Sequence, residues 1–412
     1  MKQSKTRIWF PLFALFVIFS DELFYGFVSL SGMGLESGMK SREAIVIAGI
    51  AYLLLIKDML NHKLSNRNYI QLFALLILLV LYYVVQYLYS GGAKPDRYFS
   101  SLLVNGALCI PAGYVGMRLA RCYYNEHVLK YLPFFVIAVS SIVAAAVFKS
   151  AVTGVLLNDE DDVFNYQSAS YYLSYCFSYS FFYVFLYKDK RDKGFSRLEK
   201  YGMTVMLFVC ALGCILGGGR GAFVYLVCVS TFVVYRLLKQ KGKAKGTTIV
   251  LLMIAAGVMV ILAQYFQVFE SSGFTRVSGR LTKDDARTQL WFLAMNAFQE
   301  SPIIGHGLGS IWWEVGFYSH NMLSDFLVET GIVGAVFFVT VLIKIFVCLS
   351  KRSKVSSFDM FIFLVFLGAL VKYTFSGYWF SAPKLFLAFG YVFGMSKQMR
   401  VLSKKDIKIF SN

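Results

Sequence analysis

Two arginines and one histidine, far apart in the sequence, have the chemistry needed to hold an anion and move a proton. Arg220 follows three glycines, Arg287 begins a segment with apolar periodicity, and His320 directly precedes a long apolar run. Arginine binds phosphate oxygens through a planar fork of N–H donors, and a neutral imidazole can accept a proton from a hydroxyl. Brought together by the fold, the three side chains would hold a diphosphate beside an activated hydroxyl.

Each of the three residues also has an ordinary structural explanation. Arg220 can be an arginine at the membrane boundary whose side chain extends into water. Arg287 can form an ion pair with Asp284 or Asp285. His320 can be a hydrogen-bonded structural histidine. The functional interpretation therefore depends on all three lying on the same side of a membrane.

The residues after Arg287 predict a short amphipathic helix. Its apolar residues share one helical face and are Leu290, Leu293, Ala294 and Ala297. Asp284 or Asp285 can cap its start, and Pro302 follows its end. Arg287 would lie in the first turn, where the helix dipole disfavours a cation. A cation at such a position suggests an anion held by the arginine together with backbone N–H groups.

His320 is expected in the first turn of the long helix that follows it. The positive end of the helix dipole there favours the neutral imidazole, the form that acts as a general base. Arg276 and Arg280 lie just before Arg287 and are candidates for the same cationic patch. The glycine-rich segment 305–309, which contains the only other outward-facing histidine, is interpreted as a turn because no strand precedes it.

The composition places these residues in a membrane protein. Of the 412 residues, 58% are hydrophobic and only 16% are charged, with a formal net charge of +18. Soluble domains carry about 25% charged residues, so a soluble enzyme, a disordered chain and a disulfide scaffold are excluded. Apolar runs near the length of a membrane span recur throughout, which predicts an all-α polytopic protein with about 12 transmembrane helices. The predicted spans are 8–29, 43–60, 69–89, 98–119, 129–149, 167–187, 201–219, 221–238, 247–266, 322–345, 358–376 and 378–396.

Charge distribution predicts the orientation of these spans. Most of the 41 lysines and arginines fall in alternate loops, and most aspartates and glutamates fall in the others. Because cytoplasmic loops are enriched in basic residues, both termini are expected in the cytoplasm. The basic, then apolar, N-terminus resembles a signal peptide without a small-residue cleavage site, so we interpret it as an uncleaved first span. Arg220, Arg287 and His320 then all face outward.

The spans and loops define five predicted segments. The longest outer loop stands apart, and long ordered loops in compact folds are usually functional. The segments are N-terminal transmembrane helices (1–200), helices with an arginine hairpin (201–266), a large periplasmic loop (267–321), C-terminal helices (322–396) and a basic cytoplasmic tail (397–412). A tyrosine-rich stretch within the first segment, 166–187, can either contact sugar or lipid or pack between spans.

Three motifs resemble the O-antigen ligase/polymerase family. His320-Asn321, then nine residues, then Gly331-Ile332-Val333-Gly334 resembles its histidine motif. The stretch 287–309, with its tryptophan, proline and spaced glycines, resembles the family segment that precedes this motif. Gly219-Arg220-Gly221-Ala222 resembles the family's arginine hairpin. The resemblance covers residues 200–345 in motif detail, and only the hydropathy layout matches before them.

The resemblance implies a glycosyltransferase of the C-type membrane class in the bacterial inner membrane. Such enzymes use undecaprenyl-diphosphate-linked glycans on the periplasmic face, with no cofactor, metal or nucleotide sugar. By position, Arg220 and Arg287 would bind the diphosphate and His320 would activate the acceptor hydroxyl. Arg276, Arg280 and Asn321 would be further substrate contacts. Implied partners are the lipid-linked donor and acceptor, the bilayer, a chain-length regulator and a flippase, with no nucleic acid.

Three functions remain open at this stage. A polymerase would join lipid-linked repeat units, and a ligase would transfer the finished O-antigen to lipid A–core of lipopolysaccharide. The sequence Gly-Gly-Gly-Arg at 217–220 resembles polymerases more than ligases, which favours the first. The competing class is a flippase for lipid-linked oligosaccharides. Transporters tend to have repeated halves and charges near mid-span, whereas here the charges gather in one outer loop and at span ends.

Overall fold

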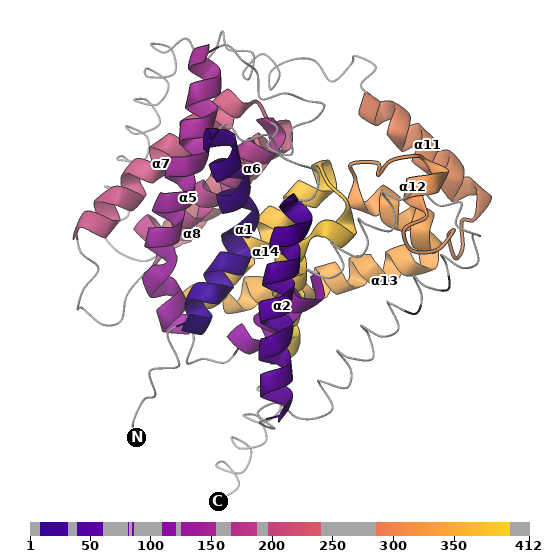
Figure 1. The fold of residues 1–412 in the computed structure, drawn as a ribbon, viewed down its shortest axis with the longest axis horizontal. Coiled ribbons are helices and arrows are strands. Elements are labelled where there is room, and N and C mark those ends of the chain that lie inside the picture. Colours follow the sequence, from indigo (N-terminus) through magenta and orange to yellow (C-terminus); the bar gives the residue numbers. More distant parts are fainter. Residues whose placement is uncertain are drawn as a thin grey trace, which may run out of the picture. The chain divides into compact units, whose positions relative to one another are not determined.

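The computed structural model describes residues 9–31, 39–60, 81, 85, 109–120, 125–153, 166–187, 197–239 and 286–395. Within these ranges every regular element is helical (Figure 1). The predicted span 247–266, nearly all of 69–89, the first part of the large loop and the tail 397–412 lie outside the described residues. So do two predicted site residues, Arg276 and Arg280.

The described helices overlap the predicted spans in the same ranges, except α11 and α12, which lie in the predicted loop 267–321. They are α1 (Trp9–Ser31), α2 (Met39–Leu60), α5 (Asn125–Thr153), α6 (Tyr166–Phe181), η3 (Phe182–Leu186), α7 (Arg197–Gly217), α8 (Arg220–Lys239), α11 (Ala286–Glu300), α12 (Ile311–Glu314), α13 (Met322–Arg352), α14 (Ser357–Phe375) and η5 (Trp379–Ser381), with further helical residues at 109–119 and Pro383–Met395.

Five of the described helices are long and apolar enough to cross a membrane. These are His127–Lys149, Leu198–Gly217, Arg220–Leu238, Met322–Arg352 and Ser357–Phe375. An α-helix satisfies all of its internal backbone hydrogen bonds within itself, which is the condition for crossing a hydrocarbon layer. The all-helical, multi-pass prediction is therefore confirmed for the part of the chain that the structure describes.

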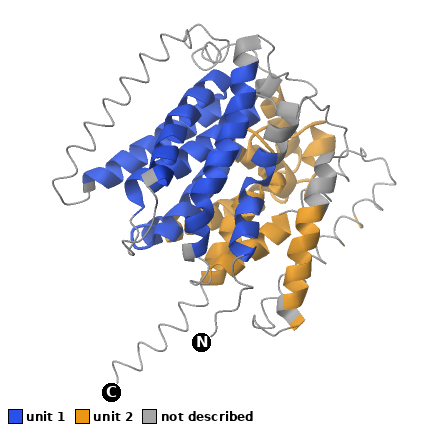
Figure 2. Ribbon diagram, turned by 60° about the vertical axis from the view of Figure 1, so that its left-hand side comes forward, with its two compact units in different colours: residues 1–36, 123–283, 350–372 blue, residues 37–122, 284–349, 373–412 orange. Residues whose placement is uncertain are grey.

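The chain folds into two compact units, coloured separately in Figure 2. Unit 1 comprises residues 1–36, 123–283 and 350–372, and its described helices are α1, α5, α6, α7, α8 and most of α14. Four tyrosines of α6 lie in its core: Tyr171, Tyr172, Tyr175 and Tyr179, the last two almost fully buried. The Tyr175 hydroxyl donates to the carbonyl oxygen of Gly368 over 3.2 Å. Span packing therefore accounts for these tyrosines.

Unit 2 comprises residues 37–122, 284–349 and 373–412, and it contains α2, α11, α12 and most of α13. Two of its helices, 109–119 and Pro383–Met395, touch backbone to backbone. A Cβ atom on Gly116 would collide with the carbonyl group of Leu387, and one on Gly390 would collide with that of Gly113. Small residues at such contacts are typical of helix association within membranes.

Candidate active site

The helix that follows the histidine motif is broken at its tenth residue. Gly331 has φ 63° and ψ −167°, so α13 consists of two helical pieces, 322–330 and 332–352. This combination of angles is essentially restricted to glycine. The predicted span 322–345 is thus correct in location but is not one continuous helix. The first glycine of the family motif is the residue that permits the break.

A loop restores the backbone hydrogen bonds that the break removes. In an unbroken helix the N–H groups of Ile332 and Val333 would donate to the carbonyls of Val328 and Glu329. Instead, they donate to the carbonyls of Pro302 and Ile303, over 2.8 and 3.3 Å.

The two carbonyls freed by the break also bond to this loop. His306 N–H donates to the carbonyl of Val328 and Gly307 N–H to that of Glu329, each over 2.9 Å. Loop 301–310 and α13 therefore exchange backbone partners reciprocally. The segment 305–309 does contain turns, as predicted, but its larger role is to complete the broken helix. That role could not be recognised from its glycines alone.

Two glycines make this close contact possible. A Cβ atom on Gly331 would collide with the backbone of Ile303. One on Gly305, which has φ 71°, would lie 2.5 Å from the backbone of Glu329 and Thr330. Neither position has room for a side chain, and both have backbone angles that other residues rarely adopt. The glycines of the stretch 287–309 and of the histidine motif thus serve one structural junction.

Glu329 lies at this junction and is fully buried. Its Oε1 accepts a hydrogen bond from the Tyr378 hydroxyl over 2.7 Å, and its Oε2 accepts one from Trp379 Nε1 over 2.8 Å. The backbone N–H of Gly309 is a further donor to this carboxyl group. A buried carboxyl group is tolerated when each oxygen has a donor. Glu329 therefore joins three segments of unit 2: α13, loop 301–310 and the residues around η5.

The His320 loop is fixed at the start of α13. Asn321 caps the helix, because its Oδ1 accepts from the backbone N–H groups of Leu323 and Ser324 over 2.9 and 3.4 Å. His320 precedes this cap and has φ 59°, the only positive φ among described non-glycine residues. The prediction that His320 lies in the first helical turn is therefore wrong. It lies outside the helix, on strained backbone held by its neighbours.

Those neighbours are Ser319 and Asp325, both completely buried. The Ser319 backbone N–H donates to Asp325 Oδ1 over 2.8 Å, and the Ser319 hydroxyl donates to the same oxygen over 2.6 Å. The other oxygen, Asp325 Oδ2, has no hydrogen-bond partner among the described residues. Asp325 thus anchors the residue immediately before His320 through two bonds. An anchored neighbour is what keeps a strained backbone conformation in place.

The helix that carries Arg287 contacts the same loop. Trp291 Nε1 donates to the carbonyl oxygen of Ser319 over 2.8 Å. Arg287 lies in the first turn of α11, as predicted, four residues before Trp291. Figure 1 shows α11 and α12 beside the first turns of α13. The structure thus brings the backbone around Arg287 and His320 into one local arrangement of unit 2.

One detail of the predicted apolar face of α11 is wrong. Ala294 and Ala297 are buried and Leu290 is half-buried, but Leu293 is 48% exposed. The helix therefore contacts the rest of unit 2 through a narrower face than the pattern predicted, made largely of small residues.

Arg220 lies in unit 1, as the first residue of α8. The glycine hairpin before it is confirmed: α7 ends at Gly217, Gly218 has φ 73°, and the N–H of Gly219 donates to Ser170 Oγ over 3.1 Å. The Arg220 side chain is exposed, at the N-terminal end of its helix. An arginine there again opposes the helix dipole, as at Arg287.

An aromatic cluster surrounds His320. The His320 ring lies 4.5 Å from the Tyr318 ring and 5.6 Å from the Phe317 ring, measured between centroids. Trp312 contacts Phe317, Tyr318 and Tyr378. The imidazole is partly accessible rather than buried. The arrangement can therefore present the imidazole to a hydroxyl group beside aromatic faces.

Sequence reasoning missed the residues that hold this site together. They are Trp291, Ser319, Asp325, Glu329, Tyr378 and Trp379. A signal was present for two of them, because acidic residues at 325 and 329 interrupt an apolar run with the spacing of one helical turn. Nothing in the sequence indicated their partners, which lie in distant segments.

Residues 205–339 match the protein-family model described as O-antigen ligase. Over this segment, about a third of its length, the chain is similar to the O-antigen ligase/polymerase family. The matched segment begins in α7 and ends in α13, so it includes Arg220, Arg287, His320 and the broken helix. The resemblance predicted from the motifs is confirmed.

A curated relative adds a second comparison. The exopolysaccharide production protein ExoQ of Rhizobium meliloti (strain 1021) is 30% identical over 122 residues, which are 25% of this chain and 28% of that protein. The match therefore spans less than a third of the relative's length. No solved structure matches the chain. Together the comparisons show that part of the chain is similar to proteins named for O-antigen ligation and exopolysaccharide production.

Proposed function

We propose that this protein polymerises undecaprenyl-diphosphate-linked repeat units of O-antigen, or of a related surface polysaccharide, on the periplasmic face of the bacterial inner membrane. One observation carries the proposal. Within the segment that matches the family, the loop of His320 is fixed by Asp325 and is tied through Trp291 to the helix of Arg287. A rigidly held loop is the support that a catalytic imidazole requires.

The proposed reaction is a single displacement. A hydroxyl oxygen of the acceptor sugar attacks the anomeric carbon of the donor glycan, and its proton passes to His320. The new bond between carbon and acceptor oxygen forms as the bond between the anomeric carbon and the diphosphate oxygen breaks. Undecaprenyl diphosphate leaves with the bonding electrons, and the configuration at the anomeric carbon inverts. Arg220 and Arg287 would stabilise the charge on this leaving group.

A ligase that transfers the lipid-linked glycan to lipid A–core is the second candidate, because the matching family model is described as O-antigen ligase. The relative, described as an exopolysaccharide production protein, and the triple glycine before Arg220 support the polymerase. A deletion strain distinguishes the two candidates. Lipopolysaccharide capped with one repeat unit indicates loss of a polymerase, whereas long chains retained on the lipid carrier indicate loss of a ligase.

Replacement of His320 with alanine tests the catalytic role. In the deletion strain, we expect His320→Ala to abolish glycan extension while the protein reaches the membrane at the normal level, because the proton acceptor is missing. Gel electrophoresis of lipopolysaccharide and an immunoblot of membranes measure the two effects. A normal ladder from His320→Ala would refute the proposed mechanism.

Conservative arginine variants test the diphosphate contacts. We expect Arg220→Lys and Arg287→Lys each to retain part of the activity at best, because lysine lacks the two-pronged geometry of guanidinium. The rate of polymer formation by the purified protein with lipid-linked substrate measures this loss. Full activity of both lysine variants would contradict phosphate recognition by the guanidinium fork. The same assay in EDTA tests the proposal that the reaction proceeds without a metal.

A further inference from the structure

The exposed surface of α11 is divided between polar and apolar residues. Successive residues of a helix advance by about 100°, so Trp291, Phe292 and Met295 share one sector. Their side chains are 43%, 67% and 39% exposed. Three exposed polar residues, Gln289, Asn296 and Glu300, occupy the adjoining sector, with the exposed Leu293 at its far edge, whereas the exposed Gln299 lies within the apolar sector. With the buried alanine face, α11 therefore has a protein-facing side and an exposed side, one half of which is largely apolar and the other half largely polar.

The apolar surface continues into the loop after α11. Ile303 and Ile304 are 65% and 73% exposed, which is unusual for isoleucine in a turn surrounded by water. Their backbone is fixed against α13, because Val333 N–H donates to the carbonyl of Ile303. These side chains are therefore held outward by an ordered junction.

The same junction carries the apolar surface on to α13. The residues of α13 that follow the break are also exposed: Ile332 is 54% and Val333 61% exposed, and one turn later Val336 and Phe337 reach 61% and 71%. The opposite face is buried at 335, 338, 342, 345 and 349. Because α13 is long and apolar enough to cross a membrane, its exposed stripe is the face that meets lipid.

We propose that α11 and the turn 302–304 lie in the membrane interface, with the apolar sector of α11 inserted at the head-group boundary of the leaflet where α13 begins. Three observations carry this inference: the largely apolar half of the exposed side of α11, the outward isoleucines, and their hydrogen-bonded continuity with the stripe of α13. A helix with one apolar and one polar exposed face is suited to this position. Trp291, with an amphipathic indole, is typical of such interfaces. The partner surface is the lipid bilayer.

The inference is independent of the proposed glycosyl transfer, since it uses no catalytic residue. It has one consequence for the site: residue 287, in the first turn of α11, would lie at the level of the lipid head-group phosphates. A second copy of the chain is the competing occupant of the apolar sector. That alternative would shield these side chains from water and from lipid alike.

Fluorescence quenching tests the proposal in the full-length protein, in nanodiscs of phosphatidylethanolamine and phosphatidylglycerol. An environment-sensitive fluorescent amino acid is incorporated singly at positions 292 and 303, with position 337 as the reference for lipid exposure and position 300 as the matched polar control on α11. Brominated lipid quenches from within the bilayer, and iodide quenches from water. Only variants that elute as a single species are compared.

We expect brominated lipid to quench positions 292 and 303 nearly as strongly as position 337, and iodide to quench position 300 several-fold more strongly than either. Equal iodide quenching at 292, 303 and 300 would place the apolar sector in water and overturn the proposal. Weak quenching by both agents at 292 and 303 would indicate a protein contact and would also overturn it. Because no step depends on activity, failure here leaves the test of His320 unaffected.

Discussion

Near the N-terminal end of α13, another segment of the chain completes the backbone hydrogen bonds of the helix. At its C-terminal end, α13 instead finishes in turns formed by neighbouring residues. The break at Gly331 exchanges backbone hydrogen bonds with residues 302–307. At the other end, the N–H groups of Val355 and Ser356 donate to the carbonyl of Arg352 over 2.8 and 3.1 Å, within five residues. The structure at the N-terminal end therefore depends on a loop that precedes the helix in the chain. The structure at the C-terminal end depends only on adjacent residues.

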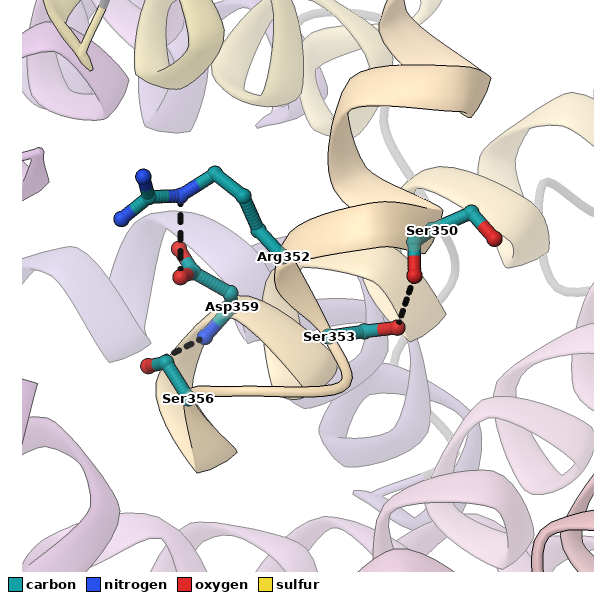
Figure 3. Close-up of polar contacts among 5 residues, drawn as sticks. All are labelled: Ser350, Arg352, Ser353, Ser356 and Asp359. Atoms are coloured by element: carbon teal, nitrogen blue, oxygen red, sulfur yellow. Dashed lines mark hydrogen bonds and ion pairs between the residues drawn. The ribbon is translucent and has the colours of Figure 1, made fainter. Parts of the chain in front are cut away.

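Charged groups differ between the two ends in the same way. Near the break, the buried Glu329 is held by uncharged donors from Tyr378 and Trp379. Beyond the last turn, Arg352 Nε pairs with Asp359 Oδ2 over 3.1 Å (Figure 3). Arg352 at the end of α13 and Asp359 at the start of α14 also complement the two helix dipoles. The end that carries the candidate site is thus the one whose structure depends on long-range contacts.

The largest expected effect comes from breaking the exchange at Gly331. We expect Gly331→Ala to destabilise the protein by several kcal/mol, because alanine at these backbone angles costs about 1–3 kcal/mol and its Cβ would collide with the backbone of Ile303. Reduced folded yield and a lower unfolding midpoint in detergent measure this effect. Activity should be lost as well, because the His320 loop begins the same helix.

A matched control separates backbone strain from collision. Gly316 also has a positive φ, 81°, but a Cβ there would meet nothing within 4 Å. Gly316→Ala should therefore cost only the conformational term, about 1 kcal/mol. If Gly331→Ala is no more destabilising than Gly316→Ala, the reciprocal exchange contributes nothing to stability.

An intermediate effect is expected at Glu329. We expect Glu329→Leu to leave the Tyr378 hydroxyl and the Trp379 indole N–H without their carboxyl acceptor, at about 1–3 kcal/mol for each buried group. Glu329→Gln retains one acceptor oxygen and should cost roughly half as much. Thermal unfolding in detergent ranks the two variants. Equal midpoints for Glu329→Leu and the unaltered protein would mean that the hydrogen bonds of Glu329 with Tyr378 and Trp379 do not stabilise the fold.

The same contrast explains what the sequence could predict. The end of α7 and the start of α8 follow from the glycines at 217–219. The end of α11 follows from its apolar pattern and from Pro302. These boundaries were predictable because each signal acts within a few residues. The exchange between residues 302–307 and the α13 break was not predictable, because an isolated glycine run is compatible with many turns. His320 was predicted in the first helical turn, but α13 begins two residues after it, at Met322. Asn321 is as good a cap as any residue, and its capping excludes the histidine from the helix.

The smallest effects are expected at the residues that cap the starts of α13 and α14. The Ser356 hydroxyl accepts from the N–H of Asp359 over 3.2 Å at the start of α14 (Figure 3), as Asn321 does at the start of α13. We expect Ser356→Ala and Asn321→Ala each to cost about 1 kcal/mol of stability. Only the second should change activity, because Asn321 adjoins His320. Unfolding midpoints and polymer formation, measured on the same preparations, report the two effects.

Asn321→Asp sharpens this comparison further. Aspartate retains the oxygen that caps α13, so the unfolding midpoint should be unchanged or slightly raised by its favourable charge at the helix start. It lacks the amide N–H donors and brings a negative charge beside the proposed diphosphate site. Activity should therefore fall while stability holds, if the predicted substrate contact of Asn321 is real. Should Asn321→Asp remain fully active, Asn321 acts only as a cap, equivalent to that of Ser356 at the start of α14, and the two caps differ solely in the loop beside them.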